Sequence, residues 1–110
     1  MFVHAVYFWL RPDLAPDERA RFVAGVESLR TIETVVHGWI GTPAETDRPV
    51  IERGYSYALT LVFDDAAGHD AYQLHPVHDR FRQTCAGYWE RVRIYDSVTH
   101  PPAPRVVVDG

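Results

Sequence analysis

Two stretches of the chain are apolar on both of their alternating faces, and they limit the folds that the chain can adopt. The first covers residues 2–10 and has His4 as its only strongly polar member. The second covers residues 55–63, where Tyr55, Tyr57 and Leu59 alternate with small or apolar side chains. Strands of this kind usually lie in the centre of a sheet and are covered on both sides. We therefore expect a sheet with these two segments at its centre.

The other segments carry ordinary signals for helices, loops and outer strands. Phe22, Val26 and Leu29 recur at helical spacing behind Pro16, whose fixed φ favours a helix start. Asp64 and Asp65 are predicted to cap the next helix. In chain order, we predict a helix from 16 to about 30, a strand at 35–40, a loop at 41–53, helices at 66–74 and 76–85, and a charged, edge-type strand at 88–96.

The order β-α-β-β-α-α-β predicts an α+β fold. It suits a ferredoxin-like split βαβ arrangement, in which a four-stranded antiparallel sheet carries its helices on one face. The second face would then hold large apolar side chains, more than a monomer leaves in water. Either a second copy of the chain or a large ligand must cover this face, and a symmetric homodimer is the ordinary solution.

Length and composition exclude several classes of protein. The 110 residues suit one domain, which we place at 1–97, before a Pro-rich tail at 98–110 that either docks, for example on a partner subunit, or is disordered. A net charge of −4 without any Lys/Arg cluster argues against nucleic acid and membrane surfaces as partners. The single Cys85 excludes an internal disulfide, and the apolar N-terminus lacks the features of a signal peptide. A cytoplasmic protein is expected.

Residues 72–81 hold the densest cluster of reactive side chains. Pro76 ends any helix that arrives from Tyr72, because it has no N–H and its ring clashes one turn back, yet it suits the first turn of a new helix. The resulting elbow can direct the phenol of Tyr72 and the imidazole of His78 into one volume. Alternatively, His75 caps the second helix and His78 is a half-buried structural residue.

A metal site in this region lacks a convincing set of ligands. His75 and His78 are three positions apart, which can bring two imidazoles to one ion. A third ligand is not evident, and His69 and Asp79 are candidates only on geometry. We therefore expect no metal at the elbow.

The chain resembles the stress-responsive dimeric α/β-barrel (Dabb) family over residues 2–97. The resemblance is carried by the motifs Val3-His4-Ala5-Val6, Gly54-Tyr55-Ser56-Tyr57, Tyr72-Gln73-Leu74-His75-Pro76-Val77-His78 and Val92-Arg93-Ile94-Tyr95-Asp96. It implies a ferredoxin-like fold and a homodimer whose two sheets close a barrel. Related barrel-forming folds bind haem through a histidine, and His4, His37 and His78 are the residues of this chain that could do so. The resemblance is to the haem-free branch, however, and implies no cofactor.

One branch of that family is similar to olivetolic acid cyclase-like polyketide cyclases. By resemblance, His78 is the general base of an aldol-type cyclisation, and Tyr72 assists it. His4 and Trp89 match positions that line the pocket of those enzymes. Tyr57 stands where the cyclase has a histidine, and we count Tyr57 and His75 among the ligand-binding candidates.

Two functions follow as hypotheses. In the first, the protein is an acid–base catalyst of the cyclase or isomerase type, acting on a small apolar carbonyl compound in a pocket near the elbow. In the second, it is a non-catalytic stress-related protein that acts as a stable dimer through binding or structure. An open cavity that reaches His78 favours the first hypothesis.

Overall fold

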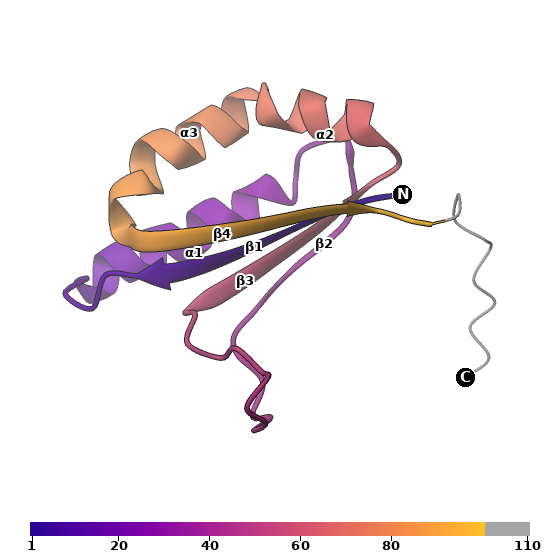
Figure 1. Ribbon diagram of the computed structural model, residues 1–110. Helices are drawn as coiled ribbons and strands as arrows, with labels where there is room; N and C mark the ends of the chain where they lie inside the picture. The colour runs from indigo at the N-terminus through magenta and orange to yellow at the C-terminus, as the bar shows by residue number, and fades with distance from the viewer. Residues whose placement is uncertain (101–110) are drawn as a thin grey trace.

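The computed structural model of the chain describes residues 1–100 (Figure 1). Its order of elements confirms the predicted ferredoxin-like α+β fold. The strands are β1 (Phe2–Leu10), β2 (Val35–Gly41), β3 (Tyr57–Phe63) and β4 (Trp89–Val98). The helices are α1 (Pro16–Leu29), α2 (Ala66–Gln73) and α3 (Pro76–Cys85), with a short 3₁₀ turn, η1 (Ala86–Tyr88), after α3.

The sheet has the order β2-β3-β1-β4. All neighbouring strands are antiparallel. The two doubly apolar segments, β1 and β3, are therefore the central pair, as their composition predicts. The register places His4 opposite Leu61 on one side and opposite Asp96 on the other.

The start of β3 differs from the prediction. We expect residues 55–63 to form one strand with Tyr55 and Tyr57 on the same face, whereas the strand begins at Tyr57. Just before the strand, Ser56 contacts β1 twice: its backbone N–H donates a hydrogen bond to the carbonyl of Phe8 at 2.7 Å, and its hydroxyl accepts one from the N–H of Leu10 at 2.9 Å. The ring of Tyr55 packs against Tyr7, with the ring centroids 5.0 Å apart, on the face opposite the helices, whereas Tyr57 packs against Phe22 on the helix side.

The core lies between the sheet and the helices. The predicted inner stripe of α1, formed by Phe22, Val26 and Leu29, is buried. Phe22 meets Phe8 of β1 edge to face, with the ring centroids 5.0 Å apart, and it also contacts Phe81 of α3. Contacts of this geometry add about 0.5–1.5 kcal/mol beyond the burial of apolar area.

Local chemistry fixes the ends of the two helices that form the elbow. The side chain of Asp65 accepts a hydrogen bond from the N–H of Gly68, which caps α2 as the sequence predicts. His75 caps α3, because its Nδ1 accepts a hydrogen bond from the N–H of Val77 at 3.1 Å. The elbow is thus held by one cap on each helix and by Pro76 at the first position of α3.

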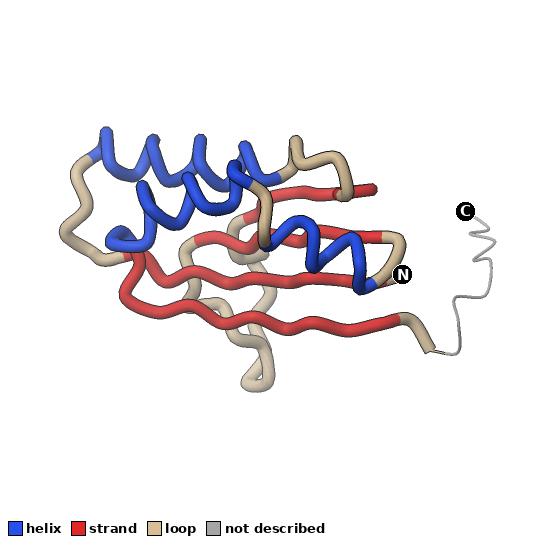
Figure 2. The backbone as a smooth tube through the Cα atoms, turned by 90° about the horizontal axis from the view of Figure 1, so that it is seen from above, coloured by secondary structure: helices blue, strands red, loops and turns tan. Residues whose placement is uncertain are grey.

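The helices cover one face of the sheet and leave most of β4 uncovered (Figure 2), although Trp89 at its start stacks on Phe81 of α3. This strand is exposed at nearly every position, which agrees with the predicted edge. None of the helices within residues 1–100 is long and apolar enough to cross a membrane. The predicted docking tail lies almost entirely at 101–110, outside the described residues.

Candidate functional site

The elbow between α2 and α3 brings Tyr72 and His78 together. Tyr72 lies in the last turn of α2, and His78 lies in the first turn of α3. Their rings meet edge to face, with centroids 4.9 Å apart. Tyr72 is almost fully buried, whereas His78 is half-buried. A phenol and an imidazole thus meet at one point, as the position of Pro76 predicts.

Both side chains line a cavity of about 430 Å³ between the sheet and the helices. Most of its wall is apolar and comes from β1, β4 and α3, including Val6, Phe81 and Ile94. Because Ile94 is 53% exposed, the cavity opens along the edge that β4 forms. An apolar cleft of this size with a few polar groups is typical of a site for a small molecule.

The surroundings shift the pKa values of His78 and Tyr72 in opposite directions. Burial lowers the pKa of His78, and the nearby charge of Arg82 lowers it further, so the imidazole is neutral at pH 7. Burial raises the pKa of Tyr72, and the carboxylate of Asp96 raises it further, so the phenol keeps its proton. A neutral imidazole can accept a proton and a protonated phenol can donate a hydrogen bond.

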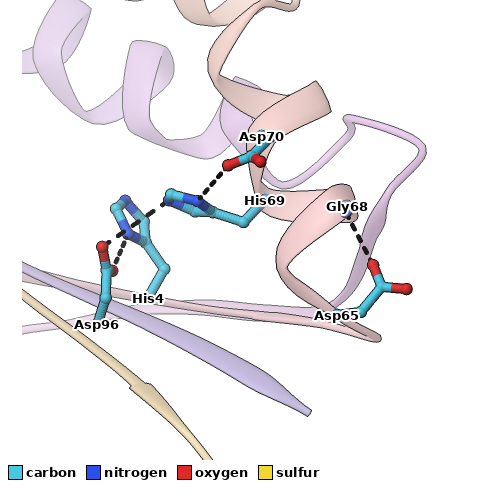
Figure 3. A network of polar contacts seen from close by, with 6 residues as sticks. All are labelled: His4, Asp65, Gly68, His69, Asp70 and Asp96. Atoms are coloured by element: carbon cyan, nitrogen blue, oxygen red, sulfur yellow. Dashed lines mark hydrogen bonds and ion pairs between the residues drawn. The ribbon is translucent and has the colours of Figure 1, made fainter.

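A second polar cluster joins β1, β4 and α2 (Figure 3), and one of its members, His4, also lines the cavity. His4 Nδ1 is 2.5 Å from Asp96 Oδ1, and His69 Nε2 is 4.0 Å from Asp96 Oδ2. Because an ionised carboxylate only accepts hydrogen bonds, Nδ1 of His4 carries the proton in this pair. Burial lowers the pKa of His4, and the contacts with Asp96 oppose this effect without reversing it.

The predicted ligand-binding residues divide into two groups. His4 and Trp89 line the cavity beside His78. His75 and Tyr57 are not among its lining residues: His75 caps α3 and pairs with Glu33 at 3.2 Å, and Tyr57 packs against Phe22 in the core. The contacts of His75 therefore match the structural alternative, in which this residue caps α3.

The polar cluster adds two residues that the sequence does not single out as a pair, His69 and Asp96. One signal for Asp96 exists in the sequence: it shares the alternation of Val92 and Ile94, so it must face inward with apolar residues. His69 carries no comparable signal, because its position beside His4 depends on how α2 crosses the sheet.

The comparison with known families decides the identity of the fold. The sequence profile described as the "Stress responsive A/B Barrel Domain" (Dabb) matches residues 2–99. The chain belongs to the Dabb family. The motifs in β1, the elbow and β4 all lie within the matched part of this Dabb protein.

Solved structures of other proteins share the fold. A Dabb-family protein with a ferredoxin-like fold from Mesorhizobium loti is 26% identical, has a TM-score of 0.71, and the match covers 89% of this chain and 95% of that one. The hydroxynitrile lyase of Passiflora edulis is 17% identical, with a TM-score of 0.74 and coverage of 94% and 96%. A dimeric ferredoxin-like protein of unknown function from Thermobifida fusca is 20% identical, with a TM-score of 0.70 and coverage of 87% and 88%.

Among curated proteins, none matches this sequence. At these levels of identity the structural neighbours describe the fold, and the chemistry has to be argued from the residues of this chain.

Proposed function

We propose that this Dabb protein is an acid–base catalyst that makes or breaks a bond at a carbonyl carbon of a small, largely apolar compound. The observation that carries the proposal is that Tyr72 and His78 meet on the wall of one open, mainly apolar cavity. His78 is the general base, and Tyr72 holds the oxygen on which negative charge develops.

The protonation of the two side chains suits these roles. The lowered pKa of His78 leaves its imidazole free to accept a proton near pH 7, either from a carbon next to a carbonyl group or from a hydroxyl group. The raised pKa of Tyr72 keeps an O–H available to stabilise an enolate or alkoxide oxygen. Apolar walls such as Phe81 and Ile94 hold the remainder of the compound and restrict water.

Two reactions fit this division of labour. One is the intramolecular aldol condensation that the resemblance to polyketide cyclases implies. The other is cleavage of a cyanohydrin to a carbonyl compound and cyanide, the activity for which the hydroxynitrile lyase of Passiflora edulis is named. In both, a base removes one proton and a donor holds one oxygen.

The test is turnover of aromatic and aliphatic cyanohydrins and of linear polyketones by the wild type and by His78→Ala and Tyr72→Phe. Loss of a general base typically lowers the rate by about 10²–10⁴-fold, and we expect a loss in this range for His78→Ala. Tyr72→Phe removes one hydrogen-bond donor and keeps the ring, so a loss of about 10²–10³-fold is expected.

Arg80→Ala is the matched control, because Arg80 is exposed on the same helix as His78 and is not among the residues that line this cavity. The proposal fails if His78→Ala keeps wild-type turnover of every compound that the wild type converts. It also fails if the wild type converts none of them, and the non-catalytic hypothesis then gains ground.

We also propose that the working form is a homodimer. The face of the sheet opposite the helices exposes aromatic side chains, including Trp39 at 54% and Tyr95 at 63%. Isolated apolar residues on a surface are ordinary, but a contiguous apolar patch indicates an interface. The Thermobifida fusca relative is described as dimeric, which supports the same assembly here.

A further inference from the structure

We propose that His4, His69 and Asp96 form a binding site for a divalent transition-metal ion, with Zn²⁺ as the probe ion. The site borders the cavity through His4 and draws one ligand each from β1, α2 and β4. Neither His78 nor Tyr72 belongs to it, so binding of the ion can be measured separately from the proposed reaction.

The spacing of the three side chains fits one ion. One ligand atom from each lies within 4.8 Å of the other two. Zn²⁺ bonds to nitrogen and carboxylate oxygen at about 2.0–2.2 Å, so two ligands on opposite sides of the ion are at most about 4.4 Å apart. Small changes of side-chain angle therefore bring all three into range. On binding, coordinate bonds replace the present hydrogen bond between His4 and Asp96.

A buried nitrogen without a partner points to a missing group at this place. Nε2 of His69 is buried and makes no hydrogen bond with any described residue, and the side chain is only 8% exposed. The atom faces Asp96 Oδ2 across 4.0 Å, which is too long for a hydrogen bond. An ion between the nitrogen and the carboxylate would satisfy both.

The other nitrogen of His69 has the neighbour that metal-binding histidines usually have. Nδ1 lies 3.6 Å from Asp70 Oδ1 (Figure 3). Carboxylates in this outer position favour the proton on the near nitrogen and leave the far nitrogen, here Nε2, with a free lone pair. At 3.6 Å this contact is an ion-pair distance and not a hydrogen bond, and a small movement of the exposed Asp70 side chain would be needed to form one.

The ligand chemistry selects the class of ion. Two imidazoles and one carboxylate suit Zn²⁺ and other first-row divalent ions better than Mg²⁺ or Ca²⁺, which prefer oxygen ligands alone. Three protein ligands leave at least one coordination position open. Since His4 also lines the cavity, a water molecule or an oxygen of a bound compound can occupy that position.

The experiment is a calorimetric titration of the full-length protein, without a polyhistidine tag, with Zn²⁺. We expect one Zn²⁺ per chain. His69→Ala and Asp96→Asn should each weaken binding at least about tenfold, because even the loss of an outer partner of a ligand costs about 10–100-fold. His37→Ala is the control: this histidine is exposed on β2 and should leave the affinity unchanged.

A second measurement needs no variant and so does not depend on the folding of substituted chains. Histidine ring signals of the wild type are followed by NMR during the Zn²⁺ titration. Selective shifts of His4 and His69 at one equivalent support the site. The proposal is overturned if no signal moves, if His37 or His75 responds instead, or if His69→Ala and Asp96→Asn bind like the wild type.

Discussion

His78 has to stay uncharged to act as a base, and the same requirement affects the stability of the fold. Burial and the charge of Arg82 lower the pKa of His78, whereas Asp79 opposes this effect, and His4 and His69 add to it. In the unfolded chain this imidazole titrates near its ordinary value of about 6.5. Between the two pKa values the unfolded chain therefore binds more protons than the folded protein does.

It follows that His78 lowers the free energy of unfolding as the pH falls below about 6.5 and through the lower pKa of the folded state. Above pH 6.5 its contribution is constant. Urea unfolding at pH 7.5, 6.5 and 5.5, in the presence of a chelator, measures this loss. His78→Gln should lose less stability than the wild type over the same interval, and equal losses would contradict the assignment.

The residues of the site show which parts of it could be read from the sequence. Tyr72 and His78 were within reach, because a proline between them fixes a local elbow. The pairing of His4 with Asp96 joins positions that are 92 residues apart, and it depends on the register of β1 against β4. Alternation along β4 predicts that Asp96 faces inward, but it does not reveal the partner.

Between α1 and α3, the close approach of two helices depends on one glycine. A Cβ added to Gly25 would lie 2.9 Å from Sγ of Cys85 and 3.0 Å from Cδ1 of Phe81. Both neighbours are buried and have little room to move. The helices therefore pack through Gly25, and the position of α3, which carries His78, depends on this contact.

Gly25→Ala should destabilise the protein by about 1 kcal/mol. Overpacking costs about 1–3 kcal/mol, and the better helix propensity of alanine offsets about 0.5–1 kcal/mol of it. Gly87→Ala is the comparison, because a Cβ there meets no atom within 4 Å, and its effect should stay within about 0.5 kcal/mol. Thermal or urea unfolding of both variants tests this prediction. Equal unfolding midpoints for Gly25→Ala and Gly87→Ala would show that the helices adjust freely.

Elements with a regular local pattern were predictable, and their irregular ends were not. The stripe of Phe22, Val26 and Leu29 sets the inner face of α1 without reference to the remainder of the chain. Just before β3, the side chain of Ser56 instead contacts Leu10, which lies 46 positions away in the sequence. An alternating pattern cannot reveal such a contact, and the predicted face of Tyr55 is therefore wrong.

For the whole molecule, the proposed dimer makes a prediction about the outer face of the sheet. Tyr95 packs beside Tyr7 on that face, with ring centroids 6.1 Å apart. A charge there would be buried by a second copy, so Tyr95→Asp should weaken the dimer at least about 30-fold, the equivalent of ~2 kcal/mol. Sedimentation velocity at micromolar concentration should then show monomers.

Val50→Asp provides the comparison, because Val50 is 81% exposed in the loop between β2 and β3. It should sediment like the wild type. A wild type that is already monomeric at micromolar concentration would remove the dimer from the proposed function, but it would leave the cavity and the polar cluster, which belong to one chain, untouched.

The alternation of inward and outward side chains along β4 limits which mutations this strand can tolerate. Val92, Ile94 and Asp96 pair with inward positions of β1, and Arg93 and Tyr95 pair with outward ones. Substitutions can alter either set independently. Loss of one codon between Val92 and Asp96 would exchange the two sets beyond that point, because side chains alternate with a period of two. Among related proteins, β4 should therefore differ by many substitutions but by almost no insertions or deletions.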